Sequence, residues 1–96
     1  MKRHGDLLIV KVGELPVGVL PWATRVLAEG EATGHKHELD RGDVYELDGV
    51  LYFRVADGEI STLTHQEHHA LTFDPGVYKV IQQREYAPEG WGYVAD

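Results

Sequence analysis

The segment Tyr45-Glu46-Leu47-Asp48-Gly49-Val50-Leu51-Tyr52-Phe53 decides the fold class of this chain. Its central Asp-Gly pair suits a two-residue type I′ turn, because both central residues of that turn need positive φ. Aliphatic and aromatic strand formers flank the pair on both sides. The segment therefore predicts a β-hairpin, and the alternation of its second strand puts Leu51, Phe53 and Val55 on the buried face.

Turn signals of the same kind recur along the rest of the chain. Asp57-Gly58 repeats the pair, so we expect a three-stranded meander over residues 44–64. Asp74-Pro75-Gly76 is typical of a turn, and residues 77–86 after it predict the longest strand. Leu20-Pro21-Trp22 predicts a bend or an edge strand, because proline cannot donate to a ladder. No segment has helical periodicity.

These patterns predict an all-β fold with about seven or eight short strands, mostly antiparallel, arranged as a small β-barrel or β-sandwich. The 96 residues suffice for one hydrophobic core, so we expect a single domain over residues 1–96. Residues 87–96 contain Pro88, Gly90 and Gly92, and they predict an irregular C-terminal tail.

Composition excludes several functional classes. The chain has no cysteine, so disulfides and thiolate metal ligands are excluded and a metal must rest on nitrogen and oxygen donors. A formal net charge of −7 with only nine Lys and Arg makes nucleic acid an unsuitable partner. No span approaches the roughly 20 apolar residues of a membrane helix, and the run at residues 7–10 is too short for a signal peptide. We expect a soluble, cytoplasmic protein.

Five of the six histidines lie in two short clusters, His35-Lys36-His37 and His65-Gln66-Glu67-His68-His69. In an extended strand His35 and His37 share a face, with Cα atoms about 6.5 to 7 Å apart, so both imidazoles can reach one ion. Zn²⁺ takes about four ligands in a tetrahedron, and the second cluster could supply the others. His65 and His68 converge only through a turn, whereas His69 shares the side of His65 in a strand. The alternative is that both clusters are solvated turns.

Named catalytic motifs do not fit. The glutamate of the second cluster is not next to its first histidine, as the helical zinc-protease motif requires, and the inverted form of that motif fails as well. The chain also lacks a Walker loop, a dinucleotide fingerprint and a nucleophile elbow.

Gly34-His35-Lys36-His37 in an all-β chain resembles the first metal motif of the cupins, which are small barrels that bind a metal. The match is partial, because Arg41 and Gly42 stand where the cupin glutamate is expected. A wider resemblance is to a group of short bacterial and phage proteins of unassigned function. It covers about half of the chain, in residues 27–37, 63–68, 75–80 and 83–86.

The pattern of that second group includes Glu67 and excludes His69. The resemblance therefore implies that His68, rather than His69, joins the site. The expected metal ligands are His35, His37, His65 and His68. We expect Zn²⁺ as the ion, with other first-row divalent metals as alternatives.

Two roles for such an ion stay open. With three histidine ligands and an open position, the ion would lower the pKa of a bound water toward about 7, and Glu67 would act as general base in a small hydrolase or lyase. With four ligands the ion would be structural. In the catalytic case Arg84 and Tyr86, late in the longest strand, are the expected contacts to an unknown small-molecule substrate, although they would also suit an ordinary surface.

Two functions without catalysis compete with the metal enzyme. An acidic β domain with two Trp and five Tyr suits a homo-oligomeric binding or accessory module, for which we expect a dimer. The resemblance points this module to a phage or bacterial defence context. Clustered histidines also charge together between about pH 5 and 7, as a pH-responsive switch requires.

Overall fold

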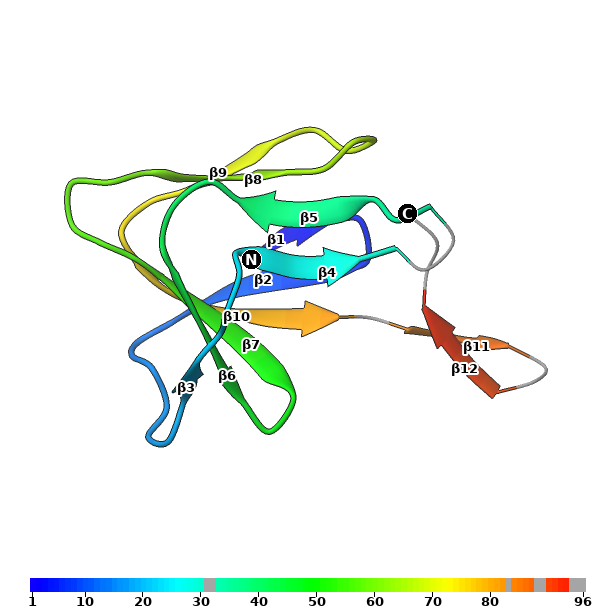
Figure 1. The fold of residues 1–96 in the computed structure, drawn as a ribbon, viewed down its shortest axis with the longest axis horizontal. Coiled ribbons are helices and arrows are strands. Elements are labelled where there is room, and N and C mark those ends of the chain that lie inside the picture. The colour runs from blue at the N-terminus through cyan, green and yellow to red at the C-terminus, as the bar shows by residue number, and fades with distance from the viewer. Residues whose placement is uncertain (31–32, 83, 88–89, 94–96) are drawn as a thin grey trace.

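Two antiparallel β-sheets enclose one apolar core in the computed structural model of this chain (Figure 1). The structure describes residues 1–30, 33–82, 84–87 and 90–93, with side chains as far as residue 82. The larger sheet has the order β1-β2-β10-β7-β6-β3, with β1 (Lys2–His4), β2 (Leu7–Val12), β3 (Leu20–Pro21), β6 (Asp43–Leu47), β7 (Val50–Val55) and β10 (Gly76–Gln82). The smaller has the order β4-β5-β8-β9, with β4 (Val26–Glu29), β5 (Lys36–Leu39), β8 (Ser61–Thr64) and β9 (Leu71–Phe73).

The all-β, antiparallel fold predicted from the sequence is confirmed, as a sandwich rather than a closed barrel in the described part of the chain. The chain forms more strands than the seven or eight expected, because many of them contain only two to four residues. No helix within the described ranges could span a membrane.

The predicted hairpin is confirmed as β6 and β7. Asp48 and Gly49 have φ values of 51° and 81°, as a type I′ turn requires, and Leu47 pairs with Val50 across it. Phe53 on β7 is fully buried, as the alternation predicts. The β3 segment at Leu20–Pro21 is an edge strand that pairs with β6 alone, also as predicted.

The predicted three-stranded meander is wrong, because β8 leaves the larger sheet. The chain turns at Asp57-Gly58, but only Gly58 has positive φ, so a type I′ hairpin cannot form there. β8 instead crosses to the smaller sheet and pairs with β5 and β9. Leu63 of β8 is fully buried, so β8 covers the apolar core as part of the smaller sheet.

The C-terminal segment also differs from the irregular tail that we expected. β11 (Arg84–Ala87) and β12 (Gly90–Tyr93) pair as an antiparallel hairpin separate from both main sheets. In the register Tyr86 stands opposite Trp91, and two aromatic strand formers outweigh the glycines beside them.

The core lies between the sheets around three aromatic rings in mutual contact, of which Phe53 and Tyr78 are stacked and Phe73 meets both of them edge-on. Phe53 of β7 lies 5.3 Å from Phe73 of β9 and 4.9 Å from Tyr78 of β10, measured between ring centroids. The other buried core residues are Leu7, Ile9, Leu27, Leu39, Val44, Val55, Leu63 and Val80. Because these side chains come from both sheets, the apolar centre fixes how the sheets face each other, and it thereby positions the histidines that lie beside it.

Candidate metal site

Four imidazoles from three distant segments meet between the two sheets. His4 ends β1, His37 lies in β5, and His65 and His68 lie in the connection between β8 and β9. Their six ring-centroid distances run from 4.3 to 6.1 Å. β1 and β5 belong to different sheets, and the contact between the His4 and His37 rings brings them together.

The strand pattern of β5 explains why His37 is buried. Along Lys36–Leu39 the side chains alternate between exposed and buried, and His37 and Leu39 take the two inward positions with exposures of 0% and 2%. His37 therefore occupies a core position where an apolar side chain would otherwise be expected. A buried imidazole needs polar partners there, and those partners are the other histidines and Asp6.

A turn after β8 brings His65 and His68 to the same side, as the sequence requires for both to join the site. The backbone N–H of Glu67 donates to Nδ1 of His65 at 3.0 Å. Oε1 of Gln66 accepts from the backbone N–H of Lys36 at 3.0 Å, which ties the turn to β5. The His65 and His68 rings consequently lie 4.5 Å apart.

The spacing of the four rings suits a tetrahedral ion. If each imidazole binds through one nitrogen at about 2.1 Å, the ring centroids lie about 5.2 Å from one another. The six observed distances lie on both sides of this value. The rings are thus gathered at the distances of a four-histidine site.

The ring nitrogens of His4 and His37 do not have the spacing of two ligands on one tetrahedral ion. Nδ1 of His4 lies 2.8 Å from Nδ1 of His37, whereas two nitrogens on a tetrahedral ion lie about 3.4 Å apart. Accordingly, no group of three or more His, Asp or Glu side chains among the described residues is already arranged as a metal site. The nitrogens of His4 and His37 would have to move apart before both could bind one ion.

The hydrogen bonds of His4 and His37 indicate which nitrogens carry lone pairs. Nε2 of His4 lies 3.0 Å from the carbonyl oxygen of His69, which can only accept, so this nitrogen carries the proton. Nε2 of His37 lies 3.6 Å from Oδ1 of Asp6, and the carboxylate favours a proton there as well. With both protons on Nε2, the two Nδ1 atoms would present lone pairs to each other at 2.8 Å.

Two facing lone pairs repel each other, so the 2.8 Å contact needs either a proton or a metal cation between the two nitrogens. A proton is disfavoured, because burial and the neighbouring His37 lower the pKa of His4 to about 4. In the alternative neutral tautomer, His37 carries its proton on Nδ1 and donates to Nδ1 of His4. The Nε2 lone pair of His37 would then face the buried carboxylate of Asp6, and the two would repel each other. A divalent cation would accept both lone pairs, with the two nitrogens moved from 2.8 Å to about 3.4 Å apart.

The carboxylate of Asp6 lies beside Nε2 of His37, on the side of the ring opposite to the contact with His4. The residue is 3% exposed, and its Oδ2 accepts a hydrogen bond from Nε2 of Gln82 at 3.0 Å. Carboxylates in this position orient metal-binding imidazoles and raise their basicity. Sequence reasoning missed both Asp6 and His4, which flank Gly5 in the turn between β1 and β2.

His35 and Glu67 lie at the exposed margin of the cluster. The His35 ring is 5.5 Å from the His65 ring, and its Nδ1 is 3.6 Å from Oε1 of Glu67. Their side chains are 27% and 53% exposed. The structure thus brings all four predicted ligands into one region, but His4 lies nearer its centre than His35. The His69 side chain is exposed and only its carbonyl oxygen takes part.

The predicted substrate contacts, Arg84 and Tyr86, belong to β11. The side chains of Arg84 and Tyr86 fall outside the described part of the structure, so their role stays a prediction.

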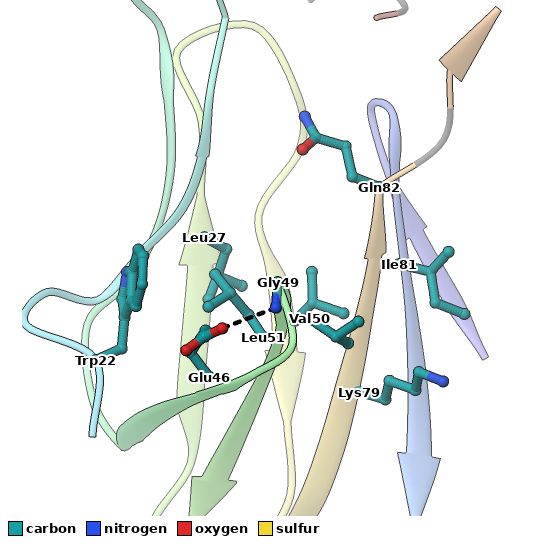
Figure 2. A pocket seen from close by; sticks show the side chains of 10 residues that line it. Trp22, Leu27, Glu46, Gly49, Val50, Leu51, Lys79, Ile81 and Gln82 are labelled. Atoms are coloured by element: carbon teal, nitrogen blue, oxygen red, sulfur yellow. Dashed lines mark hydrogen bonds between the residues drawn. The ribbon is translucent and has the colours of Figure 1, made fainter. Parts of the chain in front are cut away.

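A separate cavity of about 600 Å³ opens beside the end of β10 (Figure 2). The β10–β7 pairing ends at Val80 and Leu51, and the cavity lies where the strands separate. Glu46 lines it, but its Oε2 accepts the N–H of Gly49 at 2.7 Å (Figure 2). The lining is largely apolar and includes no histidine, so this cavity does not share the chemistry of the cluster.

A family model matches residues 3–83 of the chain. The chain belongs to a family described as a domain of unknown function, DUF8820. The DUF8820 range includes Asp6 and all six histidines, so the whole cluster lies within the family domain. Comparison with curated proteins and with solved structures found no match.

Proposed function

We propose that the histidine cluster of this DUF8820 domain binds one divalent metal ion, with Zn²⁺ preferred. The observation that carries the proposal is the set of six ring-centroid distances, 4.3 to 6.1 Å, among four imidazoles. An all-nitrogen donor set suits Zn²⁺ and leaves Cu²⁺, Ni²⁺ and Co²⁺ as competitors. The proposed ligands are His4, His37, His65 and His68, with His35 at the margin.

The primary role of the ion is structural. Four protein ligands fill a tetrahedral shell and leave no position for a substrate. His4 belongs to the larger sheet and His37 to the smaller, so an ion between them would link the two halves of the sandwich. Metal binding would then contribute directly to the free energy of folding. This role is compatible with a cytoplasmic, homo-oligomeric accessory module, which stays a prediction from the sequence.

One observation favours a second candidate, a metal-dependent hydrolase or lyase. Glu67 is half-exposed and lies 3.6 Å from His35 at the margin of the cluster, where a substrate could approach. If His68 is not a ligand, a water can take the fourth position and Glu67 can receive its proton. Replacement of Glu67 by Gln would then abolish turnover and leave metal affinity nearly unchanged.

A zinc titration tests the proposal. Metal-free protein, prepared with a chelator, is titrated with Zn²⁺ against a chromophoric competitor. We expect one ion per chain for the wild type and for His69→Ala, whose altered side chain is exposed. His37→Ala should weaken binding by at least about 100-fold.

Circular dichroism of each protein separates loss of the site from loss of the fold. Unchanged zinc affinity in a folded His37→Ala protein would refute the proposal. A melting temperature of the wild type that rises with added zinc would support the structural role.

A further inference from the structure

Three of the five arginines of this acidic chain line one surface pocket of about 320 Å³. Arg25 precedes β4, Arg41 lies between β5 and β6, and Arg54 lies in β7. The pocket shares no lining residue with the histidine cluster. In a chain with a formal net charge of −7, such a concentration of guanidinium groups needs a physical reason.

The backbone holds the three arginines in fixed positions. The carbonyl oxygen of Arg25 accepts from the N–H of Leu39 at 3.0 Å. That of Arg41 accepts from the hydroxyl of the fully buried Ser61 at 2.7 Å. Arg54 lies within the central sheet ladder, paired with Asp43 on one side and Val77 on the other. The pocket is therefore a preformed junction of three segments rather than a chance meeting of long side chains.

A close backbone contact also shapes the pocket. A Cβ atom at Gly42 would lie 2.8 Å from the carbonyl oxygen of Arg54, so the connection after Arg41 can approach β7 only because this residue is glycine. Nε of Arg25 donates to the carbonyl oxygen of Gly42 at 3.0 Å, which directs this guanidinium along the same junction.

The guanidinium charges are not neutralised by ion pairs. Asp43 and Glu59 line the same pocket, yet among the described residues no carboxylate oxygen lies within 4.0 Å of the side-chain nitrogens of these three arginines. Three cationic and two anionic side chains leave a local excess of positive charge. Arginine cannot relieve this repulsion by losing a proton, so an anion is the natural counter-charge.

We infer that this pocket binds the phosphate group of a small phosphate monoester. Guanidinium forks match phosphate oxygens in paired hydrogen bonds, which a chloride ion cannot offer. A second hollow of about 390 Å³ shares Arg25, Gly42 and Asp43 with the pocket, and Pro21 and Tyr45 are among its other lining residues. The organic part of the ester lies there. The net charge of −7 disfavours a nucleic acid polymer as the ligand, because its many phosphates would meet an acidic surface beyond the pocket.

Isothermal titration at constant ionic strength tests the inference with two probes, inorganic phosphate and phenyl phosphate. We expect saturable binding of both, with phenyl phosphate the tighter because its ring reaches the adjoining hollow. Arg54→Gln and Arg41→Gln should each weaken phenyl phosphate binding by about 10-fold or more. Lys79→Gln, which removes one positive charge at a different cavity, should leave binding unchanged.

Several results would overturn the inference. Absence of saturable binding of either probe at millimolar concentration excludes a phosphate site. Equal weakening by Lys79→Gln and Arg54→Gln shows a general effect of charge. Equal affinity for the two probes restricts the site to inorganic phosphate and removes the monoester from the assignment. The three side chains are exposed, so the variants should keep the melting temperature of the wild type.

Discussion

Nδ1 of His4 lies 2.8 Å from Nδ1 of His37, although 33 positions separate the two residues in the chain. His4 belongs to the edge strand β1 of the larger sheet, and His37 belongs to β5 of the smaller sheet. The contact therefore joins the two layers at a buried point beside the apolar core. An ion held there would link folding of the sandwich to metal supply, and the predictions below test this proposed link.

Replacing His4 should weaken zinc binding far more than replacing His35. The His4 ring lies within 6.1 Å of the rings of three other histidines, whereas the His35 ring lies 5.5 Å from that of His65 and at the exposed margin. We expect His4→Ala to lower zinc affinity by at least about 100-fold and His35→Ala by about 10-fold or less. Competitive zinc titration measures both. The reverse order would place the ion between His35 and His37 instead.

Asp6 should act by positioning His37 rather than by binding the ion. Asp6→Asn keeps the size of the side chain and the acceptor for Gln82, but it removes the charge that faces Nε2 of His37 at 3.6 Å. Zinc affinity should fall by about 10 to 100-fold with a stoichiometry of one maintained. Asp57→Asn, at an exposed turn, is the matched control and should bind as the wild type does. No difference between the two variants would argue that Asp6 has no part in the site.

Metal-free protein should lose stability as the solution is acidified below pH 6.5. Burial and His37 lower the folded pKa of His4 from 6.5 to about 4, so between these values the unfolded chain takes up a proton that the folded chain refuses. The loss should be complete near pH 4 and amount to roughly 2 to 3 kcal/mol. Above pH 6.5 this contribution does not change.

Urea denaturation at pH 7.0 and pH 4.5 in the presence of a chelator measures the effect. His4→Gln removes the titrating group and should have a shallower dependence of unfolding free energy on pH than the wild type. An identical dependence in the two proteins would mean that His4 does not titrate abnormally.

Gly42 should tolerate substitution much less well than Gly58. Both have positive φ, 104° and 82°, but a Cβ atom at Gly42 meets the Arg54 carbonyl oxygen at 2.8 Å, whereas nothing lies within 4 Å at Gly58. Gly58→Ala should cost about 1 kcal/mol from backbone strain alone, and Gly42→Ala about 2 to 4 kcal/mol. Urea unfolding of the metal-loaded proteins gives both values. Similar losses would show that the junction near Arg54 relaxes without strain.

The fold was predictable from the sequence where the signal was local. Asp48-Gly49 determines a tight hairpin by its own backbone preferences, and alternation then buries Phe53. Asp57-Gly58 is the same residue pair, but only Gly58 has positive φ there, so the turn is not type I′ and β8 joins the other sheet after it. Which sheet a strand joins depends on core packing, and no short sequence pattern contains that information.

The site was predictable as far as the histidines cluster in sequence. His37, His65 and His68 were identified by spacing and resemblance, and the structure brings their rings within 5.8 Å of one another. His4 was missed because it stands alone in a charged N-terminal segment. The sequence signal for this part of the site was the Gly5-Asp6 pair, which is typical of a tight turn. In the structure this turn connects β1 to β2, and the buried Asp6 carboxylate lies beside the imidazoles.

X-ray absorption spectroscopy of the protein loaded with one equivalent of zinc tests the four-histidine site most directly. The account predicts about four nitrogen neighbours at about 2.0 to 2.1 Å, with the outer-shell scattering of four imidazole rings. Loss of about one ring from that signal should follow His4→Ala. A spectrum dominated by water or carboxylate oxygens, without imidazole scattering, would contradict the account.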